Sequence, residues 1–536
     1  MSRTSQAEKP RQSLTSSAAL APVIVLFLGA IFIAGILVFF GGIGWPGLHW
    51  DAAYYGTPVL NVANNKGWIF GSYGPYIVSR PDLAFDDHGL LHVILYGSIL
   101  KAKTWNEYLW AQGVINGFSY AIYLALFLVH LSRVQGLRWR SVVSALLLAS
   151  VPASICIGFQ GRPEQLAPLI LTLPLCVVLF SQNRLHTLLA MGACLGLLTT
   201  LSPLTGFLFA TFLIGYFYVR NQGHFRSSIR DYLLCLIVGI LVAASVITFF
   251  TPFSATGWIA NIGAAKEGAI NHEGSLSRFS QGFWGNSTNL PAWNIAVIAC
   301  VAFGLRTIWR VGRHRILILL IITAPLLLIN QKGIDYTMMP FLPFAIGLYL
   351  QQSPNSWQRN WEKPWQIGTA QTLILAFSCF YLATILSQFL ISLNPANGQA
   401  SLRLLQHDFA LSQEGQALKQ PGIAVAYPAV VSPSLVVLGD GGIKLVAMDA
   451  GMYKFDQQPL LRDYEAATGN KVMYYLLPQN YIDRYSSPPQ SIFVGPQEFE
   501  LKSSYWLSQP NNLISRVLQR LTTFSSRYDY AVYTRK

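Results

Sequence analysis

Apolar runs recur along most of this 536-residue chain, and each is about 17 to 25 residues long, the length that crosses a bilayer core about 30 Å thick. Charged residues make up 11% of the chain, against roughly 25% in soluble domains. We therefore expect a mainly α-helical, polytopic membrane protein.

The runs predict about eleven spans with the N-terminus inside, after a polar cytoplasmic tail at 1–17. The first run, 18–42, exceeds a signal-peptide core and has no small-residue cleavage site, so we interpret it as a retained helix. The transmembrane domain then covers 18–393. Its expected spans are 19–42, 110–131, 141–159, 164–180, 187–201, 204–219, 232–251, 292–308, 316–330, 336–350 and 367–392.

Basic residues alternate between the two sides of these spans. The short outer loops hold only Arg162 and Lys332, as the positive-inside rule expects for a multi-pass protein of a bacterial plasma (inner) membrane. No basic tract for a nucleic-acid partner is present. Every inner loop is basic: Arg133, Arg138, Arg140, Arg184, Arg220, Arg226, Arg230, Arg306, Arg310, Arg313, Arg315, Arg359 and Lys363.

Three outer regions are long: 43–109, 252–291 and 394–536. The first is rich in Trp and Tyr, which suits segments lying at the lipid headgroups. The last is large enough for a domain, and we expect an extracytoplasmic α/β fold there. Its expected strands are IAVAY, IKLVAMDA, VMYYLL, SIFVG and YAVYTRK, with a helix in NNLISRVLQRLTTF.

The stretch WDAAYYGTPVLNVANNKGW (50–68) places one carboxylate, Asp51, just after the first span. Asp is a favoured helix N-cap, and a cap is the simpler interpretation. A general base is the alternative, and the two roles are compatible. Tyr55 follows one turn later, as a candidate substrate contact.

The next stretch, FDDHGLLH (85–92), offers Asp86, Asp87, His88 and His92. The two histidines are four residues apart, which is a metal-ligand spacing on a helix, but no third ligand is evident. A divalent metal is therefore an open alternative, and no cofactor is otherwise indicated. We expect Asp87, His88 and His92 to make polar contacts with a substrate.

Two short outer turns carry further charges. GRPEQLA (161–167) holds Arg162 and Glu164, which would form either an ion pair or part of a functional site, because charges at this depth are costly unless they pair or face a wet cavity. NQKGIDYTMMP (330–340) offers Lys332 and Tyr336. A lysine there would either snorkel to the interface or neutralise a phosphate.

Together these stretches resemble the GT-C integral-membrane glycosyltransferases, in the branch of protein mannosyltransferases and lipid A aminoarabinose transferases. WDAAYYGTPVLNVANNKGW is similar to that branch's first outer loop, and WNEYLWAQGVINGFSYAIYLALFLVHL (105–131) to its second span. GRPEQLA resembles its second acidic site. The His-Pro-Pro-Leu-like stretch that such proteins often carry is replaced by FDDHGLLH.

The resemblance implies inverting transfer of a sugar from a polyprenyl-phosphate donor to a glycan, lipid or protein acceptor at the outer membrane face. Asp51 would be the general base. Glu164 would orient the acceptor or Arg162. Lys332 and Arg162 would neutralise the donor phosphate.

Two other classes stay open. A transporter or flippase of lipid-linked saccharides should place polar residues at mid-span and show two matching halves. A membrane scaffold would leave Asp51 a helix cap and Glu164 one half of an ion pair. The polar residues of this chain lie at the outer ends of the predicted spans, and no internal repeat is visible. The enzyme is therefore favoured over the transporter.

Overall fold

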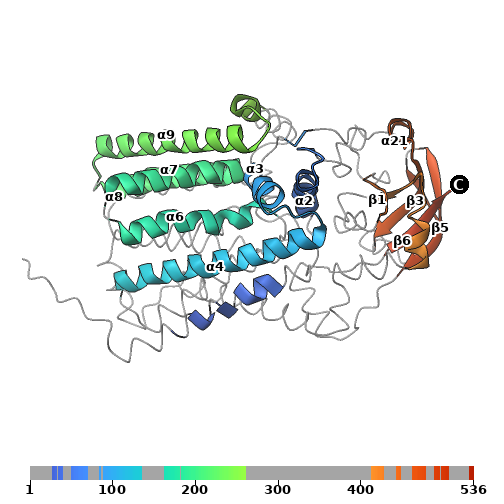
Figure 1. Cartoon of the computed structure of the whole chain (residues 1–536), viewed down its shortest axis with the longest axis horizontal. Helices are drawn as coiled ribbons and strands as arrows, with labels where there is room; N and C mark the ends of the chain where they lie inside the picture. Colours follow the sequence, from blue (N-terminus) through green and yellow to red (C-terminus); the bar gives the residue numbers. More distant parts are fainter. Residues whose placement is uncertain are drawn as a thin grey trace, which may run out of the picture.

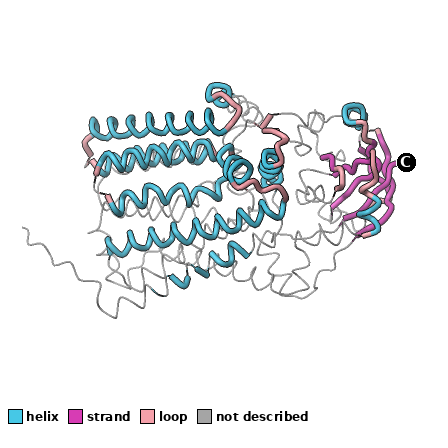
Figure 2. Tube along the Cα trace, viewed as in Figure 1, coloured by secondary structure: helices cyan, strands magenta, loops and turns pink. Residues whose placement is uncertain are grey.

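The computed structural model contains a helical part and a C-terminal sheet (Figure 1). Figure 2 shows that the strands of the described chain gather in the C-terminal part. The expectation of a mainly α protein with a C-terminal sheet is therefore confirmed. The structure describes residues 24, 27–29, 31–32, 34–39, 50–69, 84–85, 89–135, 162–181, 183–221, 223–260, 412–427, 442–447, 461–478, 488–494, 496–505 and 530–536.

The helical part consists of long helices packed side by side, with short segments across one end (Figure 1). Helix α4 packs on α6, α6 on α7, and α7 on both α8 and α9. The short segments at that end are α2 and α3. The bounds are α2 Trp50–Ala63, α3 Leu90–Val93, the π-helical turn η1 Ile94–Ile99, α4 Trp105–Gln135, the 3₁₀ turn η2 Pro163–Leu166, α6 Ala167–Phe180, α7 Arg184–Leu201, α8 Pro203–Arg220 and α9 Phe225–Phe250.

Small residues let α7 and α9 approach closely. A Cβ added at Gly196 would lie 2.5 Å from the carbonyl oxygen of Gly239. Any larger residue at position 196 would therefore collide with the backbone of α9. Glycine at helix crossings is typical of membrane proteins, in which close van der Waals packing holds helices together.

Within the described residues, two helices are long and apolar enough to cross a membrane, α7 and α9. Helix α9 exposes large apolar side chains along its length, including Leu233, Ile237 and Ile240, of which Ile240 is 66% exposed. A lipid environment suits such a face better than water does. Helices α4, α6 and α8 overlap predicted spans, whereas 141–159 and the four spans after 292 lie outside the described residues.

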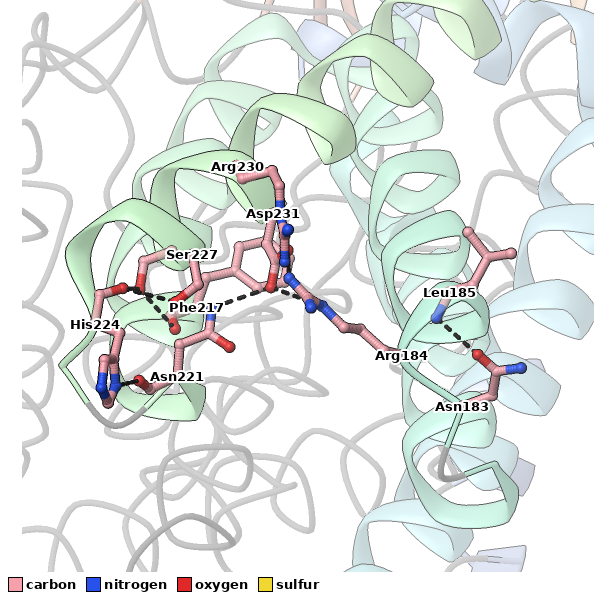
Figure 3. A network of polar contacts seen from close by, with 10 residues as sticks. Asn183, Arg184, Leu185, Phe217, Asn221, His224, Ser227, Arg230 and Asp231 are labelled. Carbon is pink, nitrogen blue, oxygen red and sulfur yellow. Dashed lines mark hydrogen bonds and ion pairs between the residues drawn. The ribbon is translucent and has the colours of Figure 1, made fainter.

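Two of the basic residues predicted for inner loops, Arg184 at the start of α7 and Arg230 in the second turn of α9, lie near each other (Figure 3). Arg184, at the start of α7, forms a two-point ion pair with the buried carboxylate of Asp231 on α9. Asn221, just after α8, donates a third hydrogen bond to Asp231, from Nδ2 to Oδ2 at 3.0 Å. One carboxylate thus ties three helices together.

The C-terminal sheet has six strands in the order β2-β1-β3-β6-β5-β4. Strands β2, β1 and β3 are parallel, and β6, β5 and β4 continue the sheet antiparallel. The region holds α20 Gln413–Ala417, β1 Ile423–Tyr427, β2 Leu445–Ala447, α21 Leu461–Thr468, β3 Lys471–Pro478, β4 Ser491–Val494, β5 Gln497–Tyr505 and β6 Tyr530–Arg535.

Five of these strands coincide with the predicted ones, and β5 was not predicted. The predicted helix at 511–524 lies outside the described residues. The sheet lies beyond the end of the helical part where α2 and α3 are found (Figure 1).

Candidate active site

Three segments from the predicted outer side meet at Gly89. This residue has a φ of +90°, and a Cβ there would lie 2.9 Å from Tyr55 Cε1 and 3.0 Å from Pro163 Cγ. Only glycine adopts this conformation readily and leaves room for both neighbours. The contact therefore brings α2, the start of α3 and the turn η2 together.

Asp51 is the second residue of α2, which begins at Trp50. It lies in the first turn rather than at the N-cap that the sequence predicted, although a carboxylate is also favoured there by the helix dipole. Tyr55 follows four residues later, so the two positions share one face of the helix. Tyr55 is the residue of α2 that lies against Gly89.

Arg162 and Glu164 flank Pro163 at the start of η2. Proline is favoured there because its fixed φ suits the first turn and its missing N–H is not needed. Arg162 Nε donates to Glu164 Oε2 at 3.1 Å, and both side chains are buried. The ion pair that the sequence left as one alternative is therefore present. It keeps two charges buried next to the Gly89 contact.

His92 lies on α3, one turn after Gly89, and only 1% of it is exposed. Gln112 Nε2 donates to the Tyr108 hydroxyl at 2.8 Å, and this hydroxyl lies 2.6 Å from His92 Nε2. The amide nitrogen of Gln112 also lies 3.4 Å from His92 Nε2, so this ring nitrogen has two polar neighbours.

The Nδ1 atom of His92 is buried without a hydrogen-bond partner among the described residues. The rings of Tyr55 and Tyr96 lie beside the imidazole, with centroid distances of 6.2 and 4.7 Å. In this apolar surrounding, burial lowers the pKa of His92 from 6.5 to about 3, because the charged form loses its hydration. The ring therefore stays neutral at physiological pH and offers one N–H donor.

Two further buried amide side chains belong to α4 and to the turn η2. Asn116 Nδ2 on α4 donates to Gln165 Oε1 on η2 at 2.7 Å. Tyr108, Gln112, Asn116 and Gln165 were not predicted as site residues. The available signal was the spacing in YLWAQGVIN, where three polar side chains recur every four residues and so share one face of an apolar helix.

The structure thus brings Tyr55, His92, Arg162 and Glu164 into one region, around the Gly89–Pro163 contact. The predicted residues Asp87, His88, Lys332 and Tyr336 lie outside the described residues, as does the side chain of Asp51. Among the residues that the structure describes, no group of three His, Cys, Asp or Glu side chains is arranged to hold a metal ion.

Several solved structures are similar to this chain at low sequence identity. The archaeal oligosaccharyltransferase AglB from Archaeoglobus fulgidus, in complex with an inhibitory peptide and a dolichol-phosphate, is 14% identical with a TM-score of 0.46, over 88% of this chain and 70% of that chain. ArnT from Cupriavidus metallidurans in the apo state is 12% identical with a TM-score of 0.48, over 96% and 98%. Both are GT-C glycosyltransferases, the superfamily that the sequence resembles.

A third structure is that of the Archaeoglobus fulgidus oligosaccharyltransferase in complex with Zn and sulfate, which is 14% identical with a TM-score of 0.42, over 84% of this chain and 68% of that chain. No protein-family model matches the sequence, and no curated protein sequence matches it. At these TM-scores and identities, the likeness concerns the general arrangement of the chain, and no site residue is inferred from it.

Proposed function

We propose that this chain is an inverting glycosyltransferase that moves a sugar from a polyprenyl-phosphate donor to an acceptor hydroxyl at the outer membrane face. The observation that carries the proposal is the contact at Gly89. It brings α2, in which Asp51 is the second residue, next to the turn that bears Arg162 and Glu164. In this proposal the two acidic positions, which are 113 residues apart in the sequence, belong to one site.

The chemistry requires a base and a cation on opposite sides of the sugar carbon. Asp51 accepts the proton of the acceptor hydroxyl, and the resulting oxygen attacks C1. The bond from C1 to the phosphate oxygen breaks, and the lipid phosphate leaves with the bonding electrons. A phosphate is a stable leaving group, so it needs charge neutralisation rather than a proton, and Arg162 and Lys332 are the proposed cations.

Glu164 has a separate role in this proposal. Its ion pair fixes the guanidinium of Arg162, whose planar group presents five N–H donors and suits a phosphate. His92 adds a neutral N–H donor in the same region. A buried charge pair is costly to maintain, and buried charges near a membrane are functional candidates for that reason.

The test measures sugar transfer from polyprenyl-phosphate sugars by the purified protein in liposomes. Asp51→Asn should lower kcat by a factor of about 100 or more, because general-base catalysis typically contributes 10²–10⁴-fold. Glu164→Gln should lower activity less, since Arg162 loses orientation but not charge.

Glu107→Gln is the matched control for these carboxylate-to-amide changes. Glu107 lies in the first turn of α4, exposed, where its Oε2 accepts from the backbone N–H of Lys103 at 2.7 Å. The amide oxygen of Gln preserves that bond, so activity should be unchanged. A folded Asp51→Asn protein as active as Glu107→Gln would exclude Asp51 as the base.

A further inference from the structure

A stripe of buried polar side chains runs along α4. Tyr108, Gln112 and Asn116 are spaced one turn apart and are at most 6% exposed, over roughly 12 Å of helix. Apolar side chains away from this stripe are exposed, with Trp110 at 52% and Phe118 at 64%. In a membrane helix, buried polar side chains face the protein interior, so this stripe marks the side of α4 that meets the site.

The last residue of the stripe, Asn116, is bonded to the turn that carries Glu164. Asn116 Nδ2 donates to Oε1 of Gln165, the residue directly after Glu164. This side-chain bond is 2.7 Å long, whereas the backbone bond that closes the turn, from Gln165 N to Arg162 O, measures 3.3 Å. The tie to α4 is therefore the tighter of these two contacts.

The buried amide of Asn116 lowers the stability of the fold relative to an apolar side chain of the same shape. Asn116 Oδ1 is buried without a hydrogen-bond partner among the described residues. A buried acceptor without a partner lowers stability, and a leucine of the same shape would avoid that cost. The presence of an amide at position 116 is thus explained by its hydrogen bond to Gln165 rather than by a gain in folding stability.

We propose that Asn116 is a positioning residue, which holds η2 in place so that Glu164 and Arg162 keep their orientation toward the substrates. This role rests on the proposed function, and it assigns Asn116 no contact with the donor or acceptor. Small displacements of a reacting group are costly: about 1 Å of misplacement lowers a rate by about 100-fold.

The experiment compares kcat, KM for a polyprenyl-phosphate sugar, and thermal unfolding in detergent. Asn116→Leu removes the donor and keeps the shape. It should lower kcat roughly 10- to 100-fold and change KM for the donor by less than about threefold. Asn221→Leu is the matched control, because it removes a comparable amide bond, to Asp231, at the other end of the helices. It should lower the melting temperature without a specific loss of kcat.

Two paired variants separate positioning from stability. Asn116→Leu combined with Gln165→Met replaces both amides by apolar groups of similar shape, so stability should recover while kcat stays low. The swap Asn116→Gln with Gln165→Asn restores an amide pair and should recover most of kcat. If Asn116→Leu alone does not fold, these two double variants still distinguish a positioning role from a purely structural one.

The proposal is overturned if the apolar pair transfers sugar like wild type, or if Asn116→Leu loses no more kcat than Asn221→Leu. A wild-type protein without any transfer activity has a different meaning. It would overturn the proposed function first, and the positioning role would fall with it.

Discussion

Acidification should destabilise this protein through His92. The ring is buried and its pKa is lowered from 6.5 to about 3, so the folded protein does not bind a proton at this site between those values. The unfolded chain does bind one below pH 6.5. Stability from this residue is therefore complete above pH 6.5 and is lost progressively as the pH falls toward 3.

The magnitude follows from the size of the pKa shift. One pKa unit corresponds to about 1.36 kcal/mol, so lowering the pH from 6.5 to 5.0 should cost about 2 kcal/mol. The entropy of unfolding is about 2.1 cal/mol/K per residue, so for the domain of 18–393 this loss should lower the melting temperature by roughly 2–3 °C.

The assay is thermal unfolding in detergent at pH 7.5 and pH 5.0, for wild type and His92→Gln. Glutamine does not titrate and retains a polar end group near the Tyr108 hydroxyl. The rings beside His92 belong to Tyr55, Tyr96 and Tyr108, which stay neutral across this range. The pH-dependent fall should be smaller in His92→Gln by roughly 2–3 °C. Equal falls in the two proteins would refute the reasoning.

Three other changes test separate contacts. Gly89→Ala should cost roughly 2–4 kcal/mol and reduce sugar transfer, because it combines an unfavourable φ with overlap at the joined segments; unfolding and transfer assays check this. Asp231→Asn should cost about 1–3 kcal/mol in thermal unfolding, because it weakens the buried anchor of Arg184. Glu465→Gln should cost about 1 kcal/mol, as the partly exposed ion pair with Arg535 is lost, and faster proteolysis of the C-terminal sheet would report it.

The strands with short continuous runs of apolar residues, such as β1 and β3, were predictable from the sequence. Strand β5 was missed because Glu498, Glu500 and Lys502 separate its apolar residues. That alternation is itself a strand signal, since Phe499 is buried in between. Helix α9 begins at Phe225, seven residues before the predicted span at 232, because its first turns are polar and an apolar-run criterion excludes them.

The candidate site was predictable only in part. The Arg162–Glu164 ion pair is local, so the sequence contained both partners, and the pair is present. The bond between Asn116 and Gln165 joins residues 49 positions apart, and no local pattern specifies such a partner. The contact of Gly89 with two other segments likewise depends on tertiary packing.

The central claim is that a sugar is transferred, and the most direct measurement follows the fate of the lipid-linked sugar. Purified wild-type protein in liposomes is supplied with a labelled polyprenyl-phosphate sugar and a panel of glycan, lipid and protein acceptors. We predict free polyprenyl phosphate together with a product of inverted anomeric configuration. Movement of the intact lipid-linked sugar across the membrane, without cleavage of its phosphate bond, would contradict the account and identify a transporter.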